Sequence, residues 1–469
     1  MSTARALFFI TLIWAGIFLP GLGSTEIKGE EGRRIMLGVE MLQDGDWLVP
    51  HYNGRAYLRK PPLVNWLIAF SIKTFHAKNE WTARLPSVLA VLALALTIVG
   101  VGSGWLGAET ALIAAIFSIT NIGLIEKGRL AEIEAVYIAL FGIAMTCWLS
   151  WWQQKKSPWL VWIVPSIFLG LGLLAKAPVH LLFFYAIVVP VLVRERRARE
   201  LLRLPHFVGI VLMLAIFLAW AVPYFRATAG LNAAGVWASQ MEERVGGGSF
   251  DWKGWLENFP RALGNFLPWL IFLPLLWNRA TMEKLAAKNL RDAEILKAAR
   301  WPVVICFFGL VLLHSQFLPR YTLPMLTPAS LLLAMVFKTR FGEKRALRWT
   351  LGAGIFAAAC MIVFAVAIVP RMNARAGVRA FAQRINENVP TSETLCIFKP
   401  EIFPPAFYIR SRVVYAYSTS EIPSDADFVL VSRDAFSRHA ETWRSSRVAA
   451  ELTDKNKNQF FLLQRRANL

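Results

Sequence analysis

Between its first two apolar runs, at residues 26–62, the chain reads EIKGEEGRRIMLGVEMLQDGDWLVPHYNGRAYLRKPP. Adjacent acids, several bases and a Trp are packed into this one loop. Ionisable groups are costly in lipid, and where they accompany membrane spans they usually serve a function. We therefore look first in this loop for the chemistry of the protein.

The apolar runs around the loop predict a mainly α-helical, polytopic membrane protein. The chain has 469 residues, is 56% hydrophobic and repeatedly shows runs of 16 to 22 apolar residues, a length that crosses about 30 Å of hydrocarbon as a helix. The first run, from Ala6 to Leu19, could also be a signal peptide. We favour an uncleaved span, because the loops alternate correctly only if this segment stays. About eleven spans are expected, near residues 5–22, 83–105, 108–125, 133–152, 158–175, 177–193, 206–225, 261–277, 301–317, 321–337 and 348–369.

The net charge of +20 fits membrane orientation better than nucleic-acid binding. The basic residues gather in short loops between apolar runs, and not in a patch interleaved with aromatic residues. Such loops stay on the cytoplasmic side. With a cytoplasmic amino terminus, the outer face then receives residues 23–82, 126–132, 175–177, 226–260, 315–321 and everything after 370.

Helical periodicity appears inside the first outer-face loop. Ile35, Val39 and Leu42 recur at i, i+4 and i+7, which predicts a helix over residues 31–43 lying at the membrane surface. The turn 43–46 closes it. Residues 63–75 are expected to form either a second interfacial helix or a short re-entrant one.

The composition changes after Pro370, which divides the chain into a membrane domain, 1–370, and a soluble α/β domain, 371–469. Short strand-like runs at 395–398, 428–431 and 460–463 accompany a helical run at 378–388. We find no catalytic motif in this part. The four cysteines of the chain are scattered, and its six histidines have no ligand spacing, so neither a disulfide framework nor a metal site is indicated.

The adjacent acids Glu30 and Glu31, followed by Arg33 and Arg34, are the first catalytic candidates. A carboxylate near the membrane interface can act as a general base toward an acceptor hydroxyl when its neighbours tune its pKa. The alternative is an ordinary helix start, where acids are favoured by the helix dipole.

A second group of candidates suits a phosphate. Tyr57 and Lys60 offer a phenol and a cation before a Pro-Pro pair, although both residue types also anchor helices at interfaces. Glu134 is placed at the apolar boundary of a span, where an acid usually faces a cavity or a cation. Lys176 ends one span, and Arg320 with Tyr321 opens another. Anchoring of a helix end at the membrane interface explains each feature alone. It explains less easily why all of them fall on the outer face.

In order and topology, these motifs resemble the polyprenyl-phosphate-dependent integral-membrane glycosyltransferases, a family that includes aminoarabinose transferases of lipid A and protein O-mannosyltransferases. The resemblance covers roughly residues 1 to 370, and the ordered set of motifs is more specific than any one of them. The matches are Glu30–Arg34 to the family's Asp-Glu-x-Arg-Tyr, Gly45–Trp47 to Gly-Asp-Trp, Tyr57 and Lys60-Pro61 to its Tyr and Lys-Pro, Arg129–Glu134 to Arg-x-Ala-x-x-Asp, Lys176–Pro178 to Lys-Gly-Pro, and Pro319–Tyr321 to Leu-Pro-x-Tyr.

The resemblance implies the C-type glycosyltransferase fold and an active site on the periplasmic face of a bacterial inner membrane. It implies inverting transfer of a sugar from an undecaprenyl-type phosphate to a lipid, glycan or protein acceptor. Glu30 would be the general base, with Glu31 or Glu134 as the second carboxylate. The carrier phosphate would be held by Arg33, Tyr57, Lys60, Lys176, Arg320 and Tyr321.

Several departures qualify this expectation. Glu30 and Glu134 replace family Asp residues, Arg59 stands where some relatives carry a metal-binding Glu, and Met241 lies near where those relatives have His. We therefore expect no metal and no other cofactor. Two other functions stay open: a secondary transporter, disfavoured because the ionisable residues crowd the ends of spans, and a non-catalytic envelope assembly scaffold.

Overall fold

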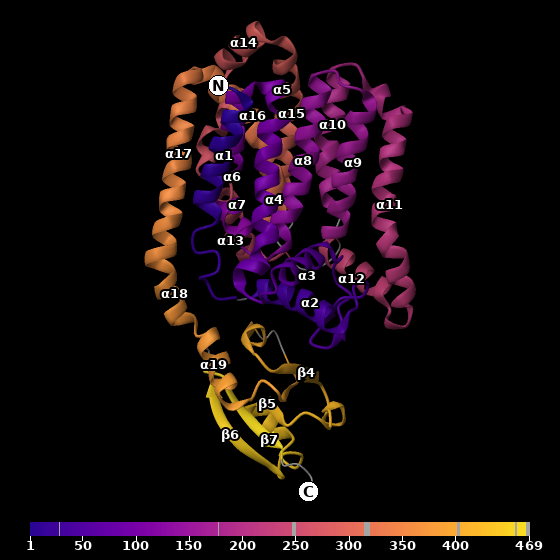
Figure 1. Cartoon of the computed structure of the whole chain (residues 1–469). Helices are drawn as coiled ribbons and strands as arrows, with labels where there is room; N and C mark the ends of the chain where they lie inside the picture. Colours follow the sequence, from indigo (N-terminus) through magenta and orange to yellow (C-terminus); the bar gives the residue numbers. More distant parts are fainter. Residues whose placement is uncertain are drawn as a thin grey trace. The chain divides into compact units, whose positions relative to one another are not determined.

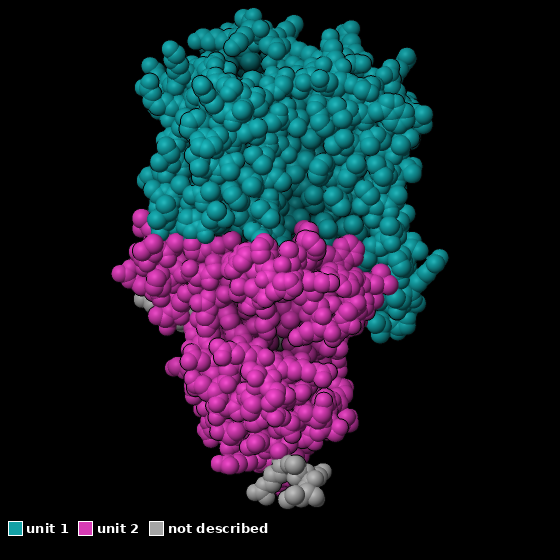
Figure 2. All heavy atoms as spheres, in the orientation of Figure 1, with its two compact units in different colours: residues 1–20, 58–64, 84–362 teal, residues 21–57, 65–83, 363–469 magenta. Residues whose placement is uncertain are grey.

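The computed structural model describes residues 1–27, 29–176, 178–245, 250–313, 319–400, 404–454 and 457–465. Its contacts separate two compact units, coloured differently in Figure 2. Unit 1 comprises residues 1–20, 58–64 and 84–362, and unit 2 comprises residues 21–57, 65–83 and 363–469. Each unit is described by itself.

Unit 1 is built from helices that run alongside one another (Figure 1). Its α-helices are α1 (Thr3–Phe18), most of α4 (Glu80–Gly100), α5 (Ser103–Leu106), α6 (Ala108–Ile119), α7 (Ile122–Gly128), α8 (Ile133–Gln153), α9 (Pro158–Ala175), α10 (Val179–Arg194), α11 (Leu204–Ala227), α12 (Ala233–Val245), α13 (Trp252–Gly264), α14 (Arg279–Lys288), α15 (Leu290–Leu313), α16 (Leu326–Phe341) and most of α17 (Glu343–Val363). The 3₁₀ segments are η1 (Ala198–Leu202), η2 (Ala229–Leu231), η3 (Trp269–Trp277) and η4 (Pro319–Met325).

Within the described residues, six helical segments are long and apolar enough to cross a membrane, or up to eight if each bent pair counts as one span. The chain is thus a multi-pass membrane protein, but the count of eleven spans is not confirmed. The runs predicted at 108–125 and 261–277 are helices broken by bends of 68° and 84°. Helices α1 and α10 have only 16 residues each, short of the roughly 20 that cross the hydrocarbon.

Small residues let the central helices of unit 1 approach closely. A Cβ added to Gly142 of α8 would lie 2.7 Å from Oγ1 of Thr327 on α16, and one added to Gly170 of α9 would lie 2.9 Å from the carbonyl oxygen of Met213 on α11. Such small residues are typical of helix contacts in membranes, where backbone proximity replaces hydrophobic burial as the source of packing. Helix α8 is almost wholly buried.

Unit 2 contains the helix predicted at 31–43, which is observed as α2 (Glu30–Asp44). It ends at Gly45, whose φ of +72° is readily adopted by glycine. A hairpin follows, with strands β1 (His51–Tyr52) and β2 (Arg55–Ala56) joined at Asn53-Gly54, both at positive φ. Residues 63–75 form helix α3 (Leu63–Phe75), of which residues 65–75 belong to unit 2; the choice between an interfacial and a re-entrant helix stays a prediction.

The C-terminal residues of unit 2 form a five-stranded sheet of order β4-β3-β5-β7-β6, with β3 parallel to β4 and β5, and β7 antiparallel to β5 and β6. The predicted helix and all three predicted strands are present. The elements are η5 (Phe364–Ile368), α18 (Val369–Ala376), α19 (Val378–Asn388), β3 (Thr394–Phe398), η6 (Pro404–Tyr408), β4 (Arg412–Ala416), η7 (Thr419–Glu421), β5 (Phe428–Ser432), α20 (Arg433–Arg438), β6 (Ser446–Thr453) and β7 (Gln459–Arg465).

Some sequence predictions are not tested by this architecture. The sides of the membrane on which the loops lie, and a soluble domain beginning at 371, stay predictions. The turns expected at 175–177 and 315–321 lie partly outside the described residues, as do part of the 226–260 loop and the side chain of Met241.

Candidate active site

The most concentrated group of predicted site residues in unit 1 surrounds Glu134, in the first turn of α8. The Nζ of Lys176, the residue that caps the end of α9, lies 3.0 Å from Oε1 of Glu134. The Nε of Arg320, in η4, lies 3.4 Å from the same oxygen. Three helix ends, far apart in sequence, thus bring two cations to one carboxylate. Glu134 and Lys176 are 5% and 6% exposed, whereas the Arg320 side chain is 32% exposed.

Aromatic side chains enclose Lys176. Its Nζ lies 4.7 Å from the ring centroid of Tyr321 and 5.5 Å from that of Tyr137, within the range of cation–π attraction. Tyr137 is itself held by His180, whose backbone N–H donates to the Tyr137 hydroxyl at 2.9 Å. The ammonium of Lys176 is therefore fixed by a carboxylate and by two aromatic faces.

A second group of charges borders Glu134. The Nζ of Lys127 lies 3.1 Å from Oε2 of Glu132 and 3.0 Å from Oε1 of Glu126. Sequence reasoning missed Lys127 and Glu132 as site neighbours, although Lys127 shortly precedes the Arg129–Glu134 motif that it noticed and Glu132 lies within that motif. Arg129 donates to the carbonyl oxygens of Ile17 and Pro20, which gives this motif residue a structural task at the end of α1.

In unit 2, the acidic pair begins α2. Glu30 forms ion pairs with Arg33, at 3.2 Å between Nη1 and Oε1, and with Arg34, at 3.8 Å between Nη2 and Oε2. The Arg34 guanidinium also donates to the hydroxyl of Tyr57 at 3.1 Å. Sequence reasoning did not place Arg34 among the site residues, but it is only 6% exposed, and its Nη1 has no hydrogen-bond partner among the described residues.

The two acids differ in their surroundings, as helical periodicity predicts. Glu31 is 1% exposed and lies on the face that also buries Ile35, while the side chain of Glu30 is 41% exposed. A base that must meet an acceptor needs access, which favours Glu30. The position on the buried stripe of α2, beside Ile35, favours Glu31.

The hairpin after α2 is held by Glu40, which sequence reasoning missed. Its Oε1 accepts from the backbone N–H of Asn53 at 2.8 Å, and its Oε2 from that of Gly54 at 3.0 Å. The chain then continues to Tyr57 and to the half-buried Lys60. Glu40 thus shapes the start of the segment that carries two of the predicted phosphate ligands, Tyr57 and Lys60.

Burial raises the pKa of Glu40 to about 7, against the opposing effect of the two backbone N–H groups. The folded state therefore binds a proton more tightly than the unfolded chain does, and stability present below the ordinary pKa is lost as pH rises through about 7. As the pH rises from 5 to 8, we expect the unfolding temperature to fall further in the native protein than in Glu40→Gln. The corresponding difference in the free energy of unfolding is on the order of 3 kcal/mol. Thermal unfolding in detergent at several pH values measures this; Glu387→Gln, on an exposed part of α19, is the control. Parallel curves for the native chain and Glu40→Gln would contradict the prediction.

Taken together, the predicted residues fall into two sets. Glu134, Lys176, Arg320 and Tyr321 meet in unit 1; Glu30, Arg33 and Tyr57 are linked in unit 2 directly or through Arg34. Lys60 belongs to unit 1, within residues 58–64. There the indole N–H of Trp237, on α12, donates to the Leu58 carbonyl oxygen at 2.7 Å. The described residues hold no group of three or more potential metal ligands, and the expected lack of a metal stays a prediction.

Known proteins resemble this chain in sequence and in fold. A family profile described as dolichyl-phosphate-mannose-protein mannosyltransferase matches residues 59–222. The undecaprenyl phosphate-alpha-4-amino-4-deoxy-L-arabinose arabinosyl transferase of Pseudomonas aeruginosa (strain UCBPP-PA14) is 26% identical over 328 residues, 68% of this chain and 57% of the relative. Its namesake in Erwinia tasmaniensis is 26% identical over 342 residues, 71% and 60% of the two chains. The chain therefore matches less than two thirds of the length of these relatives.

The crystal structure of ArnT from Cupriavidus metallidurans bound to undecaprenyl phosphate matches the whole chain with a TM-score of 0.77 at 17% identity, covering 99% of ArnT. This likeness confirms the predicted fold, a helical membrane protein with a small C-terminal α/β part. The resemblance inferred from the ordered motifs is confirmed as well. In sequence and fold, the chain is related to the polyprenyl-phosphate-dependent integral-membrane glycosyltransferases of the aminoarabinose-transferase type.

Proposed function

We propose that the chain is a glycosyltransferase of the bacterial inner membrane that moves a sugar from undecaprenyl phosphate to an acceptor on the periplasmic face. By analogy with the relatives' names, the sugar is 4-amino-4-deoxy-L-arabinose or a close analogue. Lipid A is the first acceptor to test. The observation that supports this function most is the meeting of Lys176, Arg320 and Tyr321 around Glu134, because it gathers two cations at the ends of apolar helices.

The proposed reaction is a single in-line displacement at the anomeric carbon. The acceptor O–H gives its proton to Glu30, the acceptor oxygen bonds to the anomeric carbon, and the bond from that carbon to the phosphate oxygen breaks. The electron pair leaves with the carrier phosphate, which gains negative charge. Lys60, Arg320 and Tyr321 stabilise that charge by preorganised hydrogen bonds.

Within this mechanism we assign Glu134 a positioning role. Its Oε1 faces both Lys176 and Arg320, so the carboxylate is engaged as a counter-ion and is poorly suited to accept a proton. It would hold both cations in place until the phosphate arrives. A transporter is less well supported, since the ionisable clusters described here lie at helix ends and not at the middle of a span.

Transfer can be tested with the purified chain in detergent, undecaprenyl phosphate-α-4-amino-4-deoxy-L-arabinose and lipid A. Mass spectrometry should detect lipid A heavier by one aminoarabinose and an equal amount of released undecaprenyl phosphate. If lipid A is unchanged, other glycan and protein acceptors follow. If the donor is not turned over with any of these acceptors, the proposal is overturned.

Removing a phosphate ligand should weaken use of the carrier. Each charge-assisted bond contributes about 1.5 to 3 kcal/mol, so Lys60→Ala or Arg320→Ala should lower kcat/KM for the donor by about 10-fold or more. Arg279→Ala, an exposed arginine of α14, is the matched control and should behave like the native chain. If both site variants keep native turnover and donor affinity, Lys60 and Arg320 do not belong to the site.

A further inference from the structure

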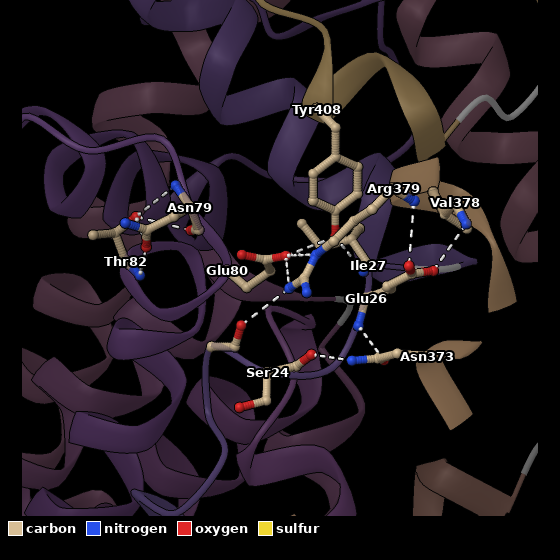
Figure 3. A network of polar contacts seen from close by, with 11 residues as sticks. Ser24, Glu26, Ile27, Asn79, Glu80, Thr82, Asn373, Val378, Arg379 and Tyr408 are labelled. Carbon is tan, nitrogen blue, oxygen red and sulfur yellow. Dashed lines mark hydrogen bonds and ion pairs between the residues drawn. The ribbon is translucent and has the colours of Figure 1, made fainter. Parts of the chain in front are cut away.

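Unit 2 contains a polar network that joins the segment before α2 to the C-terminal residues (Figure 3). Glu26, only 7% exposed, accepts from the backbone N–H groups of Val378 at 2.9 Å and Arg379 at 3.3 Å. These groups open α19, where N–H groups lack partners inside the helix. Gly377, the N-cap residue, has no side chain to serve them. Glu26 therefore supplies the cap of a helix some 350 residues away.

In return, C-terminal side chains hold the backbone of residues 23–27. The Arg379 guanidinium donates to the Gly23 carbonyl at 3.1 Å. Asn373 donates to the Ser24 carbonyl and accepts from the Glu26 N–H. The Tyr408 hydroxyl accepts from the Ile27 N–H at 2.9 Å. Four backbone groups of one short segment are thus fixed by three side chains of 373–408.

Glu80 anchors this network at the start of α4. Its Oε1 accepts from the Arg379 guanidinium, at 2.9 Å from Nε, and from the Tyr408 hydroxyl at 2.8 Å. The helix start beside it is rigid, because Asn79 and Thr82 exchange hydrogen bonds between backbone N–H and side chain in both directions. Arg379 and Tyr408 are therefore oriented by a fixed carboxylate.

The held segment leads directly into the acidic pair. Ile27 precedes Glu30 by three residues, and Gly29, which caps α2, makes no side-chain cap bond and has a φ of +57°. Helix α2 also packs on η6, where a Cβ added to Gly32 would lie 3.7 Å from that of Pro404. The first turn of α2 is thus located by contacts from the C-terminal residues and not by a cap of its own.

We propose that Tyr408 and Arg379 are positioning residues that fix the first turn of α2, and with it Glu30 and Glu31, for proton transfer. This role for the C-terminal residues rests on the proposed function. In this role Tyr408 and Arg379 keep the acidic pair in position, and they do not bind the sugar or the carrier. Loosening the network should then slow turnover while leaving the affinity for the donor unchanged.

The test compares Tyr408→Phe with Tyr415→Phe. Both changes remove one hydroxyl from a tyrosine of the C-terminal part, but the Tyr415 hydroxyl has no hydrogen-bond partner among the described residues. We expect Tyr408→Phe to lower kcat on the order of tenfold with KM for the donor unchanged. The change breaks the hydrogen bonds of the Tyr408 hydroxyl to Ile27 and Glu80, which hold the segment before the acidic pair. Arg379→Lys should retain more activity than Arg379→Met, because it keeps the charge that faces Glu80.

Hydrogen exchange of backbone amides 27–34 provides a readout that does not depend on activity. We expect faster exchange of these amides in Tyr408→Phe and Arg379→Met, with exchange of the β3–β7 sheet unchanged. If Tyr408→Phe matches Tyr415→Phe in both kcat and exchange, the positioning role is overturned. A native chain without transferase activity would instead overturn the proposed function, while the exchange experiment still decides whether the network fixes α2.

Discussion

Replacing Glu30 with Gln is expected to reduce sugar transfer by about 10²- to 10⁴-fold, the range typical for loss of a general base. The amide keeps the shape of the side chain and loses the charge that accepts the proton. Folding should survive, because the ion pairs of Glu30 with Arg33 and Arg34 are local to one helix and its side chain is 41% exposed. Pairs three or four residues apart on a helix contribute about 0.2 to 0.5 kcal/mol, and Arg34 keeps its hydrogen bond to Tyr57. Single-turnover kinetics, with donor binding measured separately, test this expectation.

Glu31→Gln is the matched comparison, since the same change is made one residue away on the same turn. Glu31 is buried at 1% exposure, so its amide variant should affect stability more than Glu30→Gln does. If Glu30 is the base, the Glu31 variant should retain clearly more transfer. If Glu31→Gln is inactive and Glu30→Gln is nearly normal, Glu31 is the general base and Glu30 is not. Normal transfer by both variants would remove the acidic pair from the mechanism.

The helical elements of the site could be predicted because their signals are local. The spacing of Ile35, Val39 and Leu42 predicts α2, and the apolar runs that end at Lys176 and begin near Glu134 predict α9 and α8. The number of spans could not be predicted with the same certainty, because the bends between α6 and α7 and between α13 and η3 do not alter hydropathy.

Pairings between distant residues were beyond the reach of sequence. Nothing near Glu134 in the chain indicates that both Lys176 and Arg320 contact its Oε1, since this depends on how three helix ends meet. The capping of α19 by Glu26 likewise joins residues about 350 positions apart. Glu40 looks like an ordinary helix acid until the hairpin turn is seen to donate to it. The motif order identified the candidates, and packing decides which of them are coupled.

The Glu134 cluster should show this coupling as a large loss of stability. Glu134→Gln removes the carboxylate from a pair in which both side chains are 7% exposed, leaving the Lys176 charge buried. Removing one partner of a buried ion pair costs about 3 to 5 kcal/mol. Chemical unfolding in detergent should detect a loss of this size. Glu257→Gln, which breaks the exposed pair with Arg261, serves as the control and should cost under about 1 kcal/mol.

A double variant separates the charge effect from simple damage to packing. Glu134→Gln combined with Lys176→Gln removes both charges, while Arg320, at 32% exposure, can turn part of its charge to water. We expect the double variant to be more stable than the sum of the two single losses predicts, by a coupling energy of about 1 to 3 kcal/mol. Additive losses would mean that the pair is not a coupled unit. In the proposed mechanism the stabilised double variant must still fail in transfer, because it has lost the cation of α9 that awaits the phosphate. Recovery of stability without recovery of activity would therefore show that the pair serves transfer and not stability alone.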